Sequence, residues 1–224
     1  SDLLMSGKGA IDLNDAQKQK LRDFILSGGL LLGEAADNSV SFARSFRVML
    51  SELFPGLEMT PLGPDHPIYN VQFKIGGGLR RGLPPLALQG LSNGVRTLAL
   101  LSPRDLGCAW QQSDLKKSPY HFQLGGNLML YASDRGQGLI GRGRSYLQRD
   151  HGKQPDNRIT VGRLRWPLVE KGSPENTYVW DPEPWAWKHL DVDLRNADAI
   201  AIETRVVDLA EPVEPKQIPL LHLT

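Results

Sequence analysis

Two short apolar runs constrain the fold of this chain more than any other feature. The runs "LLLGEA" (residues 30–35) and "TLALLS" (residues 97–102) are continuously apolar instead of alternating with polar residues. Strands with this pattern are buried on both faces, which is typical of parallel sheets covered by helices. The sequence therefore predicts an α/β protein in which these two runs are adjacent or near-adjacent central strands.

Helical patterns stand between the apolar runs. Residues 14–29 carry Asn14 as an N-cap, apolar side chains at helical spacing and Gly28-Gly29 as a stop. A second amphipathic helix is predicted over 39–56, and a third over 121–136, where Gly125-Gly126 permits close packing. Residues 57–94 are read as irregular and 102–112 as a loop. The alternation of strand and helix signals predicts layers of helix and sheet.

The later part of the chain carries its own set of elements. Strands are predicted over 159–166, 199–209 and 218–224, with a helix over 182–196. Residues 135–157 are rich in Gly and Arg and are interpreted as a linker. Its residues Arg142, Arg144, Tyr146 and Arg149 fit either a phosphate contact or a solvated surface. The triplet Gly76-Gly77-Gly78 is interpreted as a turn, since no Lys-Ser/Thr follows it as in a phosphate-binding loop.

The two outer segments read as one kind of strand. "DLLMS" near residue 2 and "PLLHLT" at 219–224 are both short and apolar, and the second would run naturally into "GKGAIDL". Residues 1–134 and 158–224 are therefore predicted to be the C-terminal and N-terminal portions of an α/β domain in permuted order. Either the chain is a circular permutation, or it spans parts of two tandem repeats. Exposed sheet edges are costly, so the portions are expected to share one sheet, within a chain or between two chains.

These segments resemble a known family. "GGLLLGEA", "DHPIY", "SPRDLGCAW" and "LGGNLMLYA" resemble the C-terminal portion of a bacterial domain of unknown function related to trehalose-utilisation (ThuA-like) proteins. "VGRLRW", "WDPEPWAWKHL" and "PLLHLT" resemble its N-terminal portion. The resemblance implies a three-layer, mostly parallel fold of the flavodoxin-like or class I glutamine amidotransferase-like type. Some large members of the group carry the domain in tandem copies. A fold shared in this way leaves the reaction open.

The amidotransferase relation raises the question of a cysteine nucleophile. Such a thiol needs a tight strand-to-helix elbow and a histidine to activate it. The single cysteine, Cys108, is followed by Trp110, and no His-x-Glu motif follows it. Cys108 is kept as a catalytic candidate beside the alternative of a structural thiol, but glutaminase activity is not expected.

Polar residues follow the predicted strands. Glu34, Asp37 and Asn38 follow "LLLG", Asp105 follows "LALLS", and Asp65-His66 is expected to join them. Ligands collect at the carboxyl ends of parallel strands, and carboxylates with a histidine suit acid/base chemistry. The alternative is structural: Asp37 and Asn38 cap the next helix, Asp65 caps a turn and Asp105 closes an Asx-turn. No metal site is assigned.

Aromatic side chains offer a further hypothesis. Trp110 and Trp185 are weak binding candidates, and Trp185 belongs to a group of tryptophans that could stack on a sugar ring. Trp185 and His189, however, stand at i and i+4, and one aromatic helix face packing on a sheet explains the same pattern.

Composition limits the partners. Lys plus Arg number 26 and Asp plus Glu 25, giving a net charge of +1 that argues against nucleic acid. A soluble module is expected, with no cofactor and no membrane span, and a protein partner or self-association. The expected function is a non-catalytic interaction or scaffold module of a larger multi-repeat bacterial protein. The alternative is a hydrolase or isomerase acting on a small polar or carbohydrate-like substrate. The compartment is left open, being extracytoplasmic if a signal lies upstream.

Overall fold

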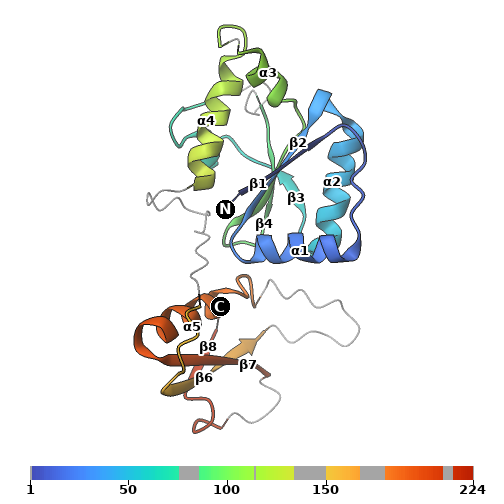
Figure 1. The fold of residues 1–224 in the computed structure, drawn as a ribbon. Coiled ribbons are helices and arrows are strands. Elements are labelled where there is room, and N and C mark those ends of the chain that lie inside the picture. Colours follow the sequence, from blue (N-terminus) through green and yellow to red (C-terminus); the bar gives the residue numbers. More distant parts are fainter. Residues whose placement is uncertain are drawn as a thin grey trace. The chain divides into compact units, whose positions relative to one another are not determined.

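The chain divides into two compact units. The computed structural model describes residues 2–75, 86–113, 115–133, 150–166, 180–208 and 214–223. Unit 1 spans residues 1–145 and unit 2 spans residues 146–224 (Figure 1). The predicted features at Gly76–Gly78 and at Arg142, Arg144, Tyr146 and Arg149 lie outside the described residues.

Unit 1 is built on a five-stranded, mostly parallel sheet. Its strand order is β1-β2-β5-β4-β3. β1, β2 and β5 run parallel, β4 is antiparallel to β5, and β3 is antiparallel to β4. The predicted adjacency of the two apolar runs is confirmed, because Leu31 pairs with Ala99 and Glu34 with Ser102. The strands are β1 (Asp2–Gly7), β2 (Leu30–Ala35), β3 (Met59–Pro61), β4 (Gln89–Ser92) and β5 (Thr97–Ser102).

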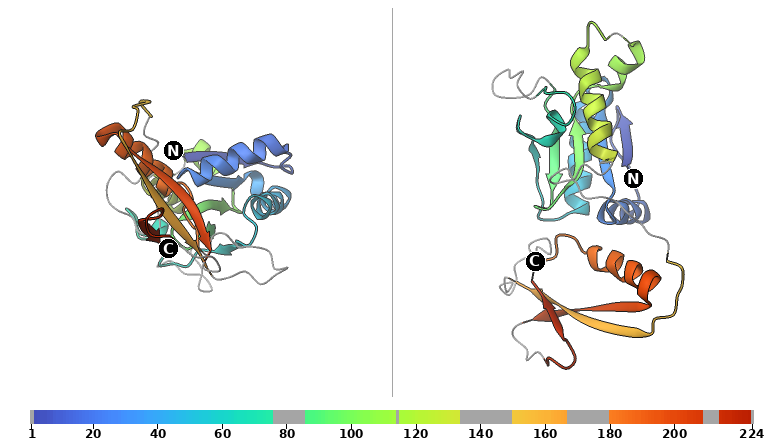
Figure 2. Two further views of the ribbon diagram at one scale, coloured as in Figure 1. Left: turned by 90° about the horizontal axis from the view of Figure 1, so that it is seen from below. Right: turned by 90° about the vertical axis from the view of Figure 1, so that its left-hand side faces the viewer.

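Helices cover both faces of this sheet. α1 (Asp15–Leu26) and α2 (Val40–Leu53) lie on one side, and α4 (Pro119–Ser133) lies on the other (Figures 1 and 2). Successive side chains of β2 point to opposite faces of the sheet, so β2 contacts helices on both sides. Leu30 and Leu32 pack toward α4, whereas a Cβ at Gly33 would lie 2.6 Å from the Phe46 ring of α2. Unit 1 is therefore a three-layer α/β structure, as predicted.

The N-cap predicted for α1 is present, whereas the N-cap of α2 differs from the predicted residues. Asn14 caps α1 in a capping box, as its sequence predicts. The cap of α2 is Ser39, whose Oγ accepts from the Phe42 N–H at 3.2 Å. The interpretation that Asp37 and Asn38 cap this helix is therefore wrong. These two residues lie in a 3-10 turn, η1 (Ala36–Asn38), and each has a left-handed φ of 56°.

Two other stretches contain more regular structure than their sequence suggested. The residues read as a loop after β5 include a short helix, α3 (Gly107–Gln112). The irregular stretch 57–94 includes β3, β4 and the 3-10 helix η2 (Pro67–Tyr69). Tyr69 is fully buried, and its hydroxyl accepts from the Leu88 N–H at 2.7 Å. Burial raises the pKa of Tyr69 to about 12.

Unit 2 is a smaller parallel α/β unit. Its sheet has the order β7-β6-β8, with every pairing parallel, and α5 packs against β7. The elements are β6 (Asn157–Arg165), α5 (Ala186–Asp198), β7 (Ile200–Asp208) and β8 (Leu220–His222). The Arg163 guanidinium lies over the Trp180 ring, 5.6 Å from its centroid, and also pairs with Asp181. The sharing of one sheet by the two portions, and their permuted order, stay predictions.

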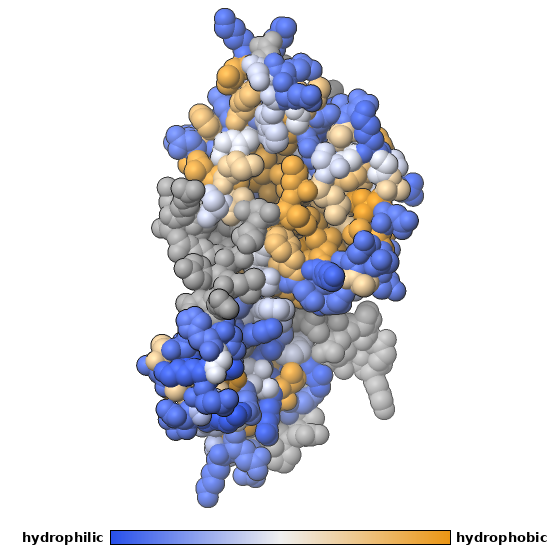
Figure 3. Space-filling view, in the orientation of Figure 1, coloured by the Kyte–Doolittle hydropathy of each residue, from blue (hydrophilic) through white to orange (hydrophobic). Residues whose placement is uncertain are grey.

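The free edge of β1 is apolar. Leu3 is 43% exposed and Leu4 is 55% exposed, although their run of apolar residues is typical of an interior strand. Among the strands that the structure describes, β1 pairs with β2 alone, so the other side of β1 is an edge of the described sheet. Figure 3 shows apolar side chains gathered on the face of unit 1 that β1 crosses in Figure 1.

Candidate functional site

The loops that follow β2 and β5 meet at the carboxyl ends of these strands. Because Glu34 pairs with Ser102, the residues beyond each strand are brought side by side. The Asp37 N–H donates to Asp105 Oδ2 at 2.6 Å, and the Asp105 N–H donates to Asn38 Oδ1 at 3.2 Å. The structure thus brings together the polar residues that the sequence placed after two different strands.

Asp105 joins the loops and also binds a backbone N–H in the first turn of α3. Its Oδ1 accepts from the Cys108 N–H at 2.7 Å, while Oδ2 is bonded to the Asp37 N–H. The left-handed backbone of Asp37 and Asn38 costs of order 1 kcal/mol each, and these bonds help to hold it. The carboxyl group of Asp105 therefore has a structural task at both of its oxygens.

Glu34 is the most buried of the predicted acidic residues. Its side chain lies at the end of β2, and the residue is 4% exposed. Its Oε1 accepts from the Leu106 N–H at 2.7 Å and from the Gly107 N–H at 2.5 Å. These bonds fix the start of α3 to the end of β2. The Glu34 carboxylate therefore has a structural role, because it holds the loop after β5 in place.

A cavity of about 500 Å³ opens beside these loops. We call it the strand-end cavity. Cys108 is exposed here, and its Sγ accepts from the Gln112 amide at 3.2 Å. His121, at the start of α4, also lines the cavity, and its buried Nδ1 has no hydrogen-bond partner within the described part of the chain. The lining residues are Asp37, Asn38, Leu86, Arg104, Asp105, Cys108, Ala109, Gln112, Ser118 and His121.

Sequence reasoning did not assign four polar residues of this cavity: Arg104, Gln112, Ser118 and His121. A signal for His121 was present. In a strand–helix unit the helix begins near the carboxyl end of the preceding strand. α4 is the long helix after β5, so Ser118, just before α4, and His121, in its first turn, could have been placed with Asp105.

Asp65 and His66 do not join this group. The His66 ring lies 5.6 Å from the ring of Tyr131, near the end of α4, and lines another cavity with Thr97 at the start of β5. Tyr131 is ten residues beyond His121, which is about 15 Å along a helix. His66 Nδ1 accepts from the Ile68 N–H at 3.2 Å and so caps η2. Burial lowers the pKa of His66. Asp65 is exposed.

The two tryptophan candidates pack against protein. Trp110 Nε1 donates to the His121 carbonyl at 2.9 Å, and a Cβ at Gly125 would lie 3.1 Å from the Trp110 ring. The expected close packing at Gly125 is therefore confirmed, and Trp110 attaches α3 to α4. In unit 2 the Trp185 ring contacts His189, and the Lys188 ammonium lies 4.0 Å from the Trp185 centroid. These contacts favour packing over sugar stacking.

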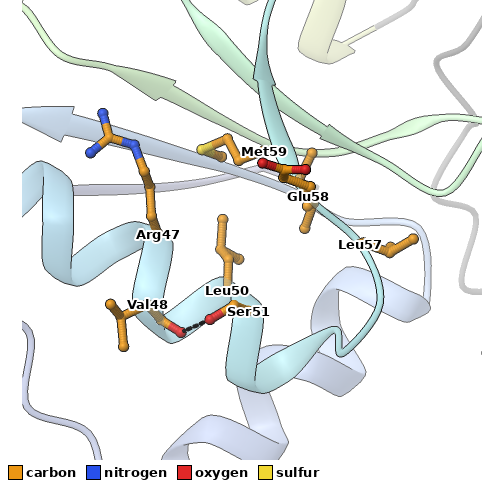
Figure 4. A pocket seen from close by; sticks show the side chains of 8 residues that line it. Arg47, Val48, Leu50, Ser51, Leu57, Glu58 and Met59 are labelled. Carbon is orange, nitrogen blue, oxygen red and sulfur yellow. Dashed lines mark hydrogen bonds between the residues drawn. The ribbon is translucent and has the colours of Figure 1, made fainter. Parts of the chain in front are cut away.

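A different cavity lies between α2 and the strand β3, at the edge of the sheet. Its volume is about 280 Å³, and the sequence pointed to none of its residues as a site. Figure 4 shows the Leu50 side chain directed into it, with Arg47 on one side and Glu58 on the other. Arg47 Nε donates to Gln89 at 2.8 Å. Its mixed lining carries no arrangement typical of a reaction.

Fold and site together define a mixed α/β module with a mostly parallel sheet, whose strand-end loops are joined by their own polar groups. The sequence profile of the DUF4159 family, a domain of unknown function, matches residues 3–133. This match covers more than half of the chain, and the chain therefore belongs to the DUF4159 family. No curated protein matches the sequence.

Within the described ranges, no group of three or more His, Cys, Asp or Glu side chains is arranged to hold a metal ion. No helix in the described part of the chain combines the length and the apolar character needed to cross a membrane.

Proposed function

We propose that this chain is a non-catalytic α/β interaction module of a larger multi-repeat bacterial protein, and that the free edge of β1 is its interaction surface. One observation carries the proposal: β1 has the composition of an interior strand but occupies an edge. Leu3 and Leu4 point to opposite faces of the sheet, and both are well exposed. An apolar strand edge of this kind invites pairing with another strand.

The polar end of the sheet supports the same proposal. Glu34 and Asp105 were the leading acidic candidates for acid/base chemistry, and their oxygens accept backbone N–H groups. His66, expected to work with them, lies near the end of α4. These residues are thus explained by the architecture of the loops.

The proposal also assigns the two parts of the chain to one domain family. Residues 1–134 and 158–224 are taken as the two portions of a ThuA-like domain of the class I glutamine amidotransferase-like fold, in permuted order, with 135–157 as the linker. The parallel β1–β2–β5 arrangement in unit 1 and the parallel β7–β6–β8 arrangement in unit 2 support it. So does the likeness between β1 and β8, which both carry Leu-Leu.

A photo-crosslinking amino acid at position 4 tests this function. The full chain carrying it is irradiated in producing cells and after purification, and adducts are identified by mass spectrometry. We expect a discrete protein adduct from position 4. A matched chain labelled at Val40, which is 80% exposed on α2, serves as the control and gives none. If position 4 reacts no more than position 40, β1 is not an interaction surface.

A second candidate function rests on the strand-end cavity. It would be a hydrolase or isomerase for a small polar or carbohydrate-like substrate, and the supporting observation is that Cys108 and His121 line one cavity with Arg104 and Asp105. Cys108 lies within α3 and not at the end of a strand, so glutaminase chemistry of the elbow type is not part of this candidate. Hydrolytic screening tests it: an activity present in the full chain should disappear in both Cys108→Ala and His121→Ala.

A further inference from the structure

We propose that the strand which pairs with the free edge of β1 is β6 of a second copy of this chain, with β1 taking the place that β8 holds beside β6. The inference rests on the proposed function, because it names the partner of the same surface. The joined sheet would have the order β7-β6-β1-β2-β5-β4-β3. β1, which is apolar over residues 3–5, would then have a neighbour on each side, like the interior strands of a parallel sheet.

The pairing of β6 with β8 shows that β6 accepts a strand of this kind. Gly162 pairs with Leu221 and Arg163 with His222, in parallel. β8 and β1 both contain a Leu-Leu pair, and both are edge strands with parallel neighbours. The β6–β8 pairing within the chain is therefore a template for pairing β6 with β1 between chains.

β8 uses little of the edge that β6 offers. β8 is 3 residues long whereas β6 has 9, and their register covers Val161 to Arg163. β1 has 6 residues, so it can form a longer ladder on the same edge. Leu220 and Leu221 of β8 are themselves 49% and 44% exposed, so β8 is held by little burial. Exchange of β8 for β1 therefore adds backbone hydrogen bonds and apolar contact.

The edge of β6 is also suited to an apolar neighbour. A Cβ at Gly162 would lie 2.9 Å from the Leu221 side chain, so the glycine makes room for a leucine of the adjacent strand. The arginines of β6 already have acidic partners and bring no unpaired charge to the interface. These ion pairs are Arg158–Glu203, Arg163–Asp181 and Arg165–Asp208.

Each copy contributes one β1 and one β6, so two reciprocal pairings close a twofold dimer. The mass of the full chain is measured by light scattering over a concentration series, with amide hydrogen exchange at each concentration. As the dimer forms, we expect residues 2–7 to gain protection while residues 220–222 lose it. The crosslinker at position 4 should give a dimer-mass adduct that maps to residues 157–165.

Two variants of opposite effect sharpen the test. Leu4→Lys should weaken dimerisation by at least about tenfold, because a lysine on an edge strand opposes pairing with another strand and removes the apolar side chain. Leu221→Asp should strengthen dimerisation, because it weakens the competing strand β8. Val40→Lys, on exposed α2, should leave dimerisation unchanged.

The outcomes separate this inference from the proposed function. A monomer at every concentration overturns the inference, and so does a dimer in which residues 220–222 keep their protection. A position-4 adduct with a different protein leaves the interaction function standing and overturns the pairing with β6. If position 4 gives no adduct, both the pairing with β6 and the proposed interaction function are refuted.

Discussion

Replacing Glu34 provides a direct test of its structural role. Glu34→Ala removes the acceptor for the Leu106 and Gly107 N–H groups, which lie 2.7 and 2.5 Å from Oε1. The Leu106 N–H is buried, so water cannot easily replace the lost acceptor. Glu34→Gln keeps an oxygen of similar position, and this pair of variants separates the loss of an acceptor from a change of side chain.

The expected magnitude follows from the two donors. A buried donor left unsatisfied costs about 1–3 kcal/mol. Glu34→Ala should therefore lower the free energy of unfolding of unit 1 by about 2–6 kcal/mol, or by about 1–3 kcal/mol if water reaches the partly buried Gly107 N–H. Glu34→Gln should cost about 1–2 kcal/mol, because an amide oxygen accepts more weakly than a carboxylate. Glu58→Ala, at an exposed position, should change the free energy by less than about 0.5 kcal/mol.

Urea unfolding followed by far-ultraviolet circular dichroism measures these free energies, and the chain's two units are fitted as separate transitions. Amide hydrogen exchange assigns the transition of unit 1 and reports the Leu106 and Gly107 amides directly. Both should exchange faster in Glu34→Ala than in Glu34→Gln. If Glu34→Ala is as stable as Glu58→Ala, or if the two amides keep their protection, the proposed anchoring is refuted.

Three further predictions concern single side chains. Cys108 should react slowly with iodoacetamide in the native chain at neutral pH; rapid labelling that His121→Ala abolishes would instead favour the enzymatic candidate. His66 has a lowered pKa in the folded state, so unfolding takes up protons as the pH falls below about 6.5, and stability is lost in that direction. His66→Asn should therefore flatten the decline in unfolding free energy between pH 7 and pH 5, and an unchanged slope would count against this assignment. Tyr69→Phe removes the acceptor for the buried Leu88 N–H and should cost about 1–3 kcal/mol in urea unfolding; a loss below about 0.5 kcal/mol would contradict the hydrogen bond.

Local sequence signals were sufficient for the central elements. The strands at 30–35 and 97–102 and the capping of α1 by Asn14 depend on hydrophobic pattern and on neighbouring residues, and the structure confirms them. The meeting of Asp37 with Asp105 also followed from sequence, because adjacent parallel strands deliver their following loops to one end of the sheet.

The details of the site depended on contacts between distant segments. Glu34 reaches Leu106 and Gly107 more than seventy positions later in the chain, and no local pattern indicates that bond. The sequence pointed to His66 as a site residue and not to His121, but packing along α4 places His121 at the strand-end cavity and His66 near Tyr131. Which histidine reaches the site therefore depended on the position of the element that carries it.

The residue pattern was enough to indicate that β1 is an apolar strand and that β8 is a strand of similar kind. It could not determine which neighbour each would have, because period-2 patterns describe the faces of a strand and not its edges. The neighbours are seen in the folded chain, where β1 pairs with β2 on one side and β6 pairs with β8 over part of its length. Backbone hydrogen bonds between strands are formed by groups common to every residue, so the choice of neighbour depends on the packing of the whole sheet.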